Sequence, residues 1–176
     1  MLKFKCHIRG LVPLLFNRFP EEEGTGGARK KAPKSKEEQV EMSLYRMKDK
    51  TIYQPEDHII GAMIKAGVAF KLRGAGKKTM KDLVKGGVFI EPIQISHLFQ
   101  KYTMDYRSVV INRGRVMKAR ARMDKWELKF EITCIDDRAT AKDIEDILKY
   151  AGGYVGIGDY RPRYGRFDIV SMDEVK

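Results

Sequence analysis

The sequence predicts an α+β protein with an antiparallel sheet and the element order β-α-β-β-α-β. Segments near both ends, 2–9 and 167–172, alternate apolar and polar residues as half-buried strands do. Two segments, 55–70 and 140–151, place apolar residues at helical spacing. Strand-like residues lie between these helices, at 88–99 and 115–134. This order is that of a ferredoxin-like or RRM-like fold, here with a long insertion after strand one.

The first strand separates two kinds of side chain. One face is apolar and faces the expected core, whereas the other is cationic. His7 belongs to the polar row, where a solvated histidine is the expected role. The apolar row is Leu2, Phe4, Cys6 and Ile8, and the polar row is Lys3, Lys5, His7 and Arg9.

The insertion occupies about 18–50. Residues 20–36 contain almost nothing that could be buried, which predicts a segment that is mobile in isolation. Its basic cluster, Arg29, Lys30 and Lys31, is either a solubilising feature or an arm that orders on nucleic acid. A short amphipathic helix is expected over 37–47.

The first core helix leads into a basic segment, 71–79, that resembles a phosphate-binding P-loop around Lys77. That motif requires glycine where Lys71 stands and Ser or Thr where Lys78 stands, so nucleotide hydrolysis is rejected. Thr79 is expected to cap a short helix that ends at the glycine pair 86–87.

The middle of the chain is expected to be β-structure. Pro92 predicts an edge strand or two short strands within 88–99, where His97 has a structural role. Residues 115–134 predict a hairpin with its turn at 124–125, which pairs Arg122 with Glu127 and Lys118 with Glu131. Arg113 and Arg115 lie outside these pairs and are the better candidates for phosphate contact.

The second core helix starts with a capping box, Thr140 and Asp143, and leads into a glycine-rich loop at 152–166. The loop holds five of the 16 glycines, with three arginines and three tyrosines. Its backbone amides could form an anion-binding nest, while arginine matches phosphate and tyrosine stacks on bases. The alternative is an ordinary helix C-cap followed by a turn, with the tyrosines at the edge of the core.

Charge and composition limit the class of function. The 176 residues fit a single domain, 1–176, and 35 Lys+Arg against 24 Asp+Glu give a net charge of +11. This surplus implies a polyanionic partner, of which nucleic acid is the commonest. No apolar run approaches the roughly 18 residues of a membrane span, so no membrane partner is expected.

The start of the chain lacks the features of a secretory signal, and its cysteines favour a cytoplasmic location. Cys6 and Cys134 lie at apolar positions of predicted strands, where buried reduced thiols are expected. Two cysteines and three scattered histidines show no zinc-site spacing. We therefore expect neither a metal nor another cofactor.

The glycine-rich segment between the second helix and the last strand resembles the signature of the RAMP superfamily, the RNA-binding proteins of CRISPR effector complexes. Two other stretches are similar to the segments that flank the thumb-like insertion of the crRNA-binding backbone subunits: the strand running into Gly10-Leu11-Val12-Pro13-Leu14, and Tyr53-Gln54-Pro55 leading to Ile60-Gly61-Ala62-Met63. The resemblance implies an RNA-binding role in antiviral defence. The chain is shorter than typical backbone subunits, and Asp49 lacks the context of the catalytic aspartate of target-cutting members.

The leading hypothesis is a non-catalytic protein that binds the phosphate backbone of single-stranded RNA or DNA, with RNA favoured. Copies could assemble side by side as a homo-oligomer or join CRISPR effector subunits. The expected contacts are Gly156, Gly158, Tyr160, Arg161, Arg163, Tyr164, Arg166, Lys77, Lys78, Arg113, Arg29, Lys30 and Lys31.

Two alternatives remain open at this point. One is a metal-independent endoribonuclease of the RAMP type that uses His7 or His58 as a general acid or base. The other is a phage-encoded single-strand-binding or assembly protein whose charge serves solubility or a protein partner.

Overall fold

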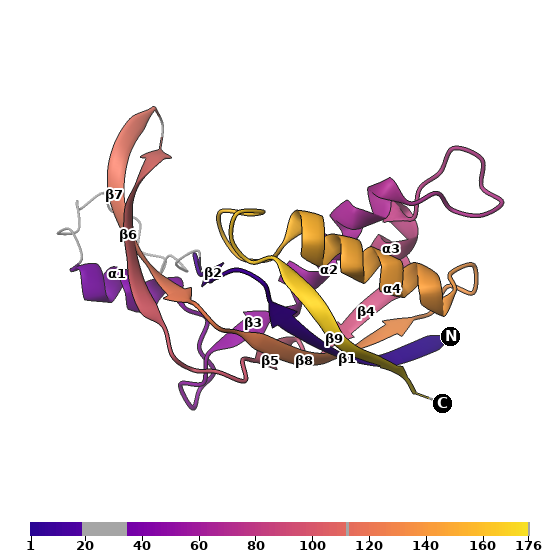
Figure 1. Cartoon of the computed structure of the whole chain (residues 1–176), viewed down its shortest axis with the longest axis horizontal. Helices are drawn as coiled ribbons and strands as arrows, with labels where there is room; N and C mark the ends of the chain where they lie inside the picture. Colours follow the sequence, from indigo (N-terminus) through magenta and orange to yellow (C-terminus); the bar gives the residue numbers. More distant parts are fainter. Residues whose placement is uncertain (19–34, 112, 176) are drawn as a thin grey trace, which may run out of the picture.

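Alternating strands at both ends of the chain meet in one four-stranded antiparallel sheet. The computed structural model describes residues 1–18, 35–111 and 113–175 (Figure 1). In chain order the elements are β1 (Leu2–Gly10), β2 (Leu14–Leu15), α1 (Lys36–Ser43), β3 (Tyr53–Pro55), α2 (Glu56–Ala66), the 3-10 turn η1 (Gly67–Ala69), α3 (Lys81–Gly87), β4 (Val88–Glu91), β5 (Gln94–Ser96), β6 (Thr103–Ile111), β7 (Gly114–Met123), β8 (Glu127–Cys134), α4 (Ala141–Tyr150), the π-helical turn η2 (Ala151–Val155) and β9 (Phe167–Glu174).

The main sheet has the order β4-β8-β1-β9, with every neighbouring pair antiparallel. Helices α2, α3 and α4 lie on one face of it (Figure 1). Because α2 connects β1 to β4 and α4 connects β8 to β9, the expected β-α-β-β-α-β arrangement is confirmed.

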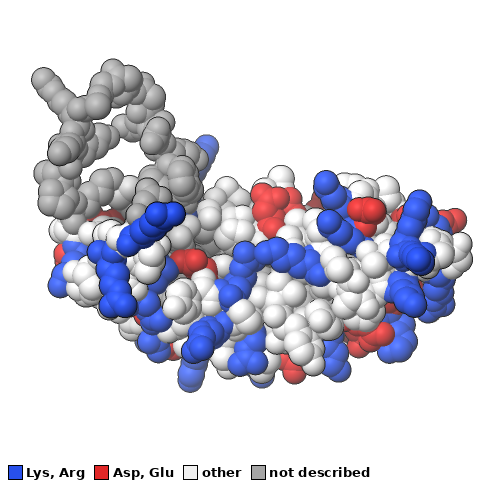
Figure 2. Space-filling model, turned by 90° about the horizontal axis from the view of Figure 1, so that it is seen from above, with Lys and Arg blue, Asp and Glu red and all other residues white. Residues whose placement is uncertain are grey.

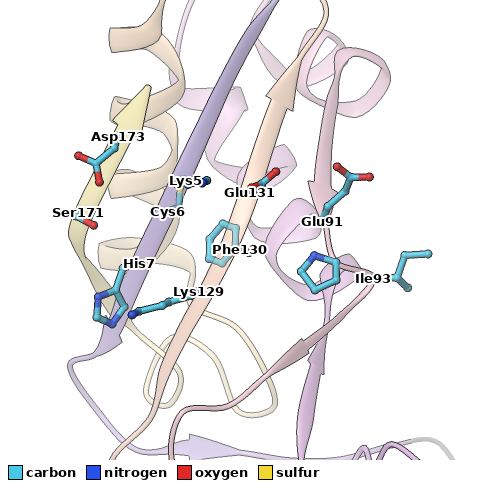
Figure 3. Close-up of a pocket in the computed structure, with 11 residues that line it drawn as sticks. Lys5, Cys6, His7, Glu91, Ile93, Lys129, Phe130, Glu131, Ser171 and Asp173 are labelled. Atoms are coloured by element: carbon cyan, nitrogen blue, oxygen red, sulfur yellow. The ribbon is translucent and has the colours of Figure 1, made fainter. Parts of the chain in front are cut away.

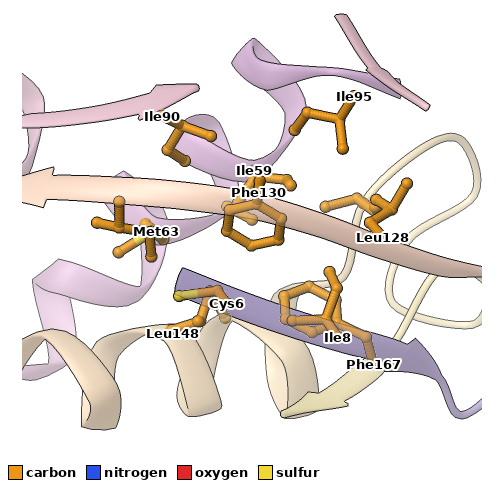
Figure 4. Close-up of a cluster of buried hydrophobic side chains, with 14 of the residues drawn as sticks. Cys6, Ile8, Ile59, Met63, Ile90, Ile95, Leu128, Phe130, Leu148 and Phe167 are labelled. Atoms are coloured by element: carbon orange, nitrogen blue, oxygen red, sulfur yellow. The ribbon is translucent and has the colours of Figure 1, made fainter. Parts of the chain in front are cut away.

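The core lies between this sheet and the helices. The apolar row of β1 is buried there, and Cys6 and Ile8 face Ile59 and Met63 of α2 and Leu148 of α4 (Figure 4). Cys6 and Cys134 are buried free thiols, as predicted. Burial raises the pKa of Cys6 to about 12, so this thiol stays protonated at neutral pH.

The local signals that set the ends of α4 are also confirmed. Thr140 accepts a hydrogen bond from the backbone amide of Asp143, and the Asp143 carboxylate accepts one from the amide of Thr140. This capping box satisfies two amides that the first helical turn leaves without partners. Helix α4 ends at Tyr150, where the backbone continues as the π-helical turn η2, and that turn leads to the glycine-rich loop.

The predicted hairpin over 115–134 is wrong. Strand β7 pairs with β6 and β2, whereas β8 pairs with β1 and β4 in the main sheet. The chain changes sheets at Trp126, whose indole packs under Gly10 and donates a hydrogen bond to the carbonyl oxygen of Val12. The alternating pattern fixes which face of a strand is buried, but it does not fix the partner strand.

The ion pairs expected across that hairpin are therefore absent. Glu127 instead accepts hydrogen bonds from His7 and Arg9, and Glu131 pairs with Lys3, all within the main sheet. Arg122 of β7 pairs with Asp124.

Three helix boundaries differ from the prediction. Helix α2 ends at Ala66, before the expected 70, where the chain tightens into the 3-10 turn η1. Helix α1 ends at Ser43, before the expected 47, because Leu44 is already extended and residue 46 bridges to 52. Helix α3 has Met80 at its N-cap without a side-chain hydrogen bond, since Thr79 pairs instead with Lys71 in a small β-bridge.

His97 is buried beside two aromatic rings, Phe16 at 5.5 Å and Trp126 at 6.4 Å between ring centroids. Neither ring nitrogen of His97 has a hydrogen-bond partner among the described residues. Burial therefore lowers the pKa of His97 to about 3, and the imidazole is neutral at pH 7.

Acid should destabilise the fold through His97. The unfolded chain protonates this residue below its ordinary pKa of 6.5, whereas the folded chain does so only near pH 3. The free energy of unfolding should therefore fall by about 2 kcal/mol between pH 6.5 and pH 5 through this one group. Urea unfolding at pH 7 and pH 5 checks this against His97→Phe, which keeps a ring but does not titrate. Equal losses in the two proteins would contradict the lowered pKa.

Candidate nucleic-acid interface

Residues 152–155 of the predicted glycine-rich loop belong to η2, so in the structure the loop spans 156–166. Its inner half, residues 156–159 and 165–166, is tied to the chain after β1. The Gly165 amide donates to the carbonyl of Pro13 at 2.8 Å, and the Asp159 amide donates to that of Leu15 at 2.9 Å. Ile157 is fully buried and its amide donates to the carbonyl of Gly165.

These contacts explain the glycines of the loop. Gly156, Gly158 and Gly165 all have a φ between 72° and 74°, a conformation that only glycine adopts freely. A Cβ on Gly158 would also overlap Leu14. The amides of Gly156, Ile157 and Gly165 donate to carbonyls of the protein itself, so they are not free to form the predicted anion nest.

The outer half of the loop carries the exposed cations. Arg161 and Arg163 are exposed, and neither forms an ion pair with a carboxylate of the described residues. Tyr160 beside them is half exposed, whereas Arg166 is partly buried next to β9. An anion bound at this loop would therefore contact the side chains of the outer half and not the amides of the inner half.

The loop is also docked against β6 and β7. Tyr164 accepts a hydrogen bond from Arg107 at 2.6 Å, and the guanidinium carbon of Arg107 lies 5.0 Å from the centre of that tyrosine ring. Arg107 pairs in turn with the buried Asp105, which raises the pKa of Arg107 above its already high value. Tyr164 is therefore occupied within the protein, and Tyr160 is the more accessible of the two predicted stacking residues.

A second link between the loop and β7 is buried. Arg120, whose side chain is only 3% exposed, bonds to Asp159 of the loop and lies 3.8 Å from Asp105. Its Nε and Nη2 have no hydrogen-bond partner among the described residues. The charges of Arg107 and Arg120 thus fix the loop beside the hairpin.

The hairpin of β6 and β7 projects away from the main sheet (Figure 1). Arg113 lies at its tip with a φ of 66°, and Arg115 follows it on β7. Both are exposed, as a phosphate contact requires. Lys118, nearer the base, donates a hydrogen bond to Asn17 at 2.7 Å.

The other predicted lysines lie at the opposite end of the helical layer. Lys77 and Lys78 are exposed in the loop at 71–79, which Figure 1 shows far from the hairpin. Arg73 of this loop pairs with Asp143 at 3.4 Å. Arg29, Lys30 and Lys31 lie outside the described residues.

The predicted residues therefore form no single cluster. They occupy three places: the hairpin tip, the glycine-rich loop and the loop at 71–79. Figure 2 shows Lys and Arg side chains spread along the length of the face that is seen from above, with fewer acids among them. We use the term basic face for the surface formed by the exposed cations of these three places, Arg113, Arg161, Arg163, Lys77 and Lys78.

The two histidines of the ribonuclease alternative differ in environment. His58 lies in a polar pocket of about 90 Å³ beneath Gly158 and Asp159, where it contacts the side chain of Gln54. Burial, and then the positive charge of Arg161, lowers the pKa of His58. His58 is therefore uncharged at neutral pH and is a poor general acid there.

His7 lies on the open face of the sheet, opposite the helices. Its Nε2 is 2.7 Å from Glu127, and Lys129 stands beside it in a shallow hollow of about 670 Å³ (Figure 3). Arg9 also contacts Glu127 and, with His7, lowers the pKa of this carboxyl group. This face carries Glu91, Glu131 and Asp173 as well, so its charge is mixed.

Metal and membrane sites find no support in the described part of the chain. Within it, no three His, Cys, Asp or Glu side chains are grouped so as to hold a metal ion. Nor does any helix there have the length and apolar character needed to cross a bilayer.

Several contributors to the interface were not predicted. Arg107 and Arg120 are brought to the loop by the pairing of β6 with β7, and no strand was predicted over 103–111. Tyr154 at the end of η2 is strongly exposed and was not singled out. Only long-range pairing places the two arginines at the loop, whereas Tyr154 lies within the predicted glycine-rich segment 152–166.

No protein-family model matches the chain, and no curated protein matches it in sequence. Among solved structures, a chain in the cryo-EM structure of the type III-B Cmr-beta bound to cognate target RNA matches 99% of this chain with a TM-score of 0.61 and 12% identity. The match covers 61% of that longer chain. A Cas6 product complex matches 94% of this chain and 50% of that chain, with a TM-score of 0.34 and 12% identity. The first match shows that the two chains share a fold.

Proposed function

We propose that this protein binds single-stranded RNA along its basic face, as a non-catalytic, RAMP-type backbone subunit of a CRISPR effector. The observation that carries the proposal is the outer half of the glycine-rich loop. It presents Arg161 and Arg163 to solvent, without carboxylate partners among the described residues, from a backbone that the protein holds in place. A guanidinium group binds phosphate oxygens more tightly when the backbone that carries it is already held in place, because less conformational entropy is lost on binding.

The rest of the basic face extends this site. Tyr160 lies beside the two arginines, and the hairpin with Arg113 stands on one side of the loop. The shared fold with a chain from an RNA-bound type III-B complex favours RNA over DNA and supports assembly with other subunits. Cytoplasmic location follows from this role.

Replacing Arg161 and Arg163 together by alanine should weaken binding of single-stranded RNA roughly 10- to 100-fold, because each charge-assisted contact contributes about 1 kcal/mol or more. The slope of log affinity against log salt should also decrease by about 1.4, or about 0.7 for each lost phosphate contact. Fluorescence anisotropy with labelled RNA at two or more salt concentrations measures both effects. The melting temperature should stay the same, since neither arginine makes an ion pair within the described residues.

The matched control is Lys5→Ala combined with Lys129→Ala. This variant removes the same charge from the open face of the sheet, where both lysines are exposed. It should bind RNA nearly as well as the native protein. If the lysine variant lost affinity and the arginine variant did not, RNA would bind the open face and the proposed site would be wrong.

A second function, metal-independent RNA cleavage, has one contact in its favour. The bond from His7 to Glu127 would orient an imidazole for proton transfer. RNA recovered intact after long incubation with the protein, with EDTA present or absent, would count against this function. Cleavage that is indifferent to EDTA and lost in His7→Ala would establish it.

A further inference from the structure

Three aromatic rings form a continuous stack at the surface of the helical layer. Phe70 meets Tyr150 edge to face, with 5.7 Å between centroids. Tyr150 stacks on Tyr154 with 4.5 Å between centroids and an interplanar angle of 26°. Phe70 and Tyr150 pack against the core, whereas Tyr154 is 70% exposed. The outermost ring is thus the most exposed tyrosine of the described chain.

The backbone holds Tyr154 in this position. Helix α4 continues directly into η2, so Tyr150 and Tyr154 lie one helical turn apart on the same side. Gly152 between them is buried so closely on Phe167 that a Cβ would overlap the backbone of that residue. The turn is therefore anchored in the core, and the ring is oriented before any ligand arrives.

The stack also joins the two basic loops of the helical layer. Phe70 directly precedes the loop that carries Lys77 and Lys78, and Tyr154 directly precedes the glycine-rich loop with Arg161 and Arg163. A strand that contacts both loops with its phosphates would pass the exposed ring between them. The ring of Tyr154 lies outside the core, since it is 70% exposed.

We propose that Tyr154 is a stacking platform for one unpaired base of a single-stranded nucleic acid bound across the basic face. This inference rests on the proposed function and extends it from phosphate contact to base contact. One face of the ring rests on Tyr150, so a base would add to the outer end of the stack. Such stacking tolerates any base, because every base has a π-face, and it disfavours duplexes, whose bases are already stacked.

Alanine at position 154 should weaken single-stranded RNA binding about 5- to 100-fold, the range that loss of one base stack produces. The salt slope should not change, because no phosphate contact is lost. Phenylalanine at position 154 should bind like the native protein. Arg161→Ala with Arg163→Ala, by contrast, should lower the salt slope, so the two kinds of contact are separated by one measurement.

Tryptophan at position 154 gives a direct readout. The single native tryptophan, Trp126, is 1% exposed and should not respond to RNA. The emission of Tyr154→Trp should be quenched as single-stranded oligouridine or oligoadenosine is added, and a duplex should quench it far less. The control is Phe89→Trp, which places an indole at a half-exposed position of β4 on the opposite face of the sheet and should show no quenching.

The outcomes separate the two proposals. If the native protein binds RNA in the anisotropy assay but Tyr154→Ala binds equally well and Tyr154→Trp is not quenched, the stacking platform is refuted and the proposed function stands. If the native protein binds no single-stranded RNA, both are refuted. Quenching of Tyr154→Trp together with the loss of affinity in Tyr154→Ala supports both.

Discussion

Gly165→Ala is expected to destabilise the protein by roughly 2 to 5 kcal/mol. Gly165 has a φ of 72°, which costs an alanine about 1 to 2 kcal/mol. The new Cβ would overlap the carbonyl oxygen of Ile157, and forcing the two apart adds about 1 to 3 kcal/mol. Thermal unfolding followed by circular dichroism should show a melting temperature that is lower by roughly 4 to 20 °C.

Gly153→Ala is the control for this experiment. Gly153 lies in η2 just before the same loop, and a Cβ there would meet nothing within 4 Å. Alanine should leave the stability unchanged or raise it by up to about 1 kcal/mol, because it favours a helical backbone. If both variants melted at the native temperature, the close approach of Gly165 to Ile157 within the loop would be disproved.

Arg120→Ala is expected to cost about 2 to 4 kcal/mol, because the partly buried Asp159 loses its ion-pair partner and the buried Asp105 keeps only Arg107. Arg120 holds Asp159 of the glycine-rich loop and lies near Asp105, and it is almost wholly buried. The loss should appear as a lower free energy of unfolding in urea. The loop should also become more accessible to limited proteolysis, because one of its two links to the hairpin is removed.

Arg122→Ala gives the comparison, two residues along the same strand. Arg122 is partly exposed and pairs with Asp124, itself about half exposed. Pairs of this kind contribute about 0 to 1 kcal/mol. A loss of stability in Arg120→Ala no larger than that in Arg122→Ala would mean that the buried guanidinium does not secure the loop.

Short-range patterns were enough to predict the main fold. Three predicted features each depend on a few neighbouring residues, and each is found in the structure. They are the alternation in β1, the helical spacing of α2 and the capping box of α4. The alternation and the helical spacing depend on which side of an element is apolar, and the order of apolar and polar residues along the chain indicates that side.

Predictions that needed a partner strand were less successful. The alternating pattern of β7 is compatible with any neighbouring strand in the right register. Nothing local therefore indicated that the chain changes sheets at Trp126, so that β7 pairs with β6 and not with β8. The exposed arginines of the loop could be predicted from composition. The hydrogen bonds that its backbone amides make within the protein could not. The amide of Gly165 bonds to Pro13 and that of Asp159 bonds to Leu15, and both partners are distant in sequence and carry no signal of the contact.

The position of β1 at the centre of the main sheet has a consequence for synthesis in the cell. The ribosome makes β1 first, yet its two neighbours, β8 and β9, are made late: Leu2 lies opposite Cys134, and Phe4 lies opposite Glu174. Until those strands emerge, both edges of β1 have no native partner strand. The sheet can therefore close only once translation of β9 is complete, and the nascent chain must be kept from aggregating until then.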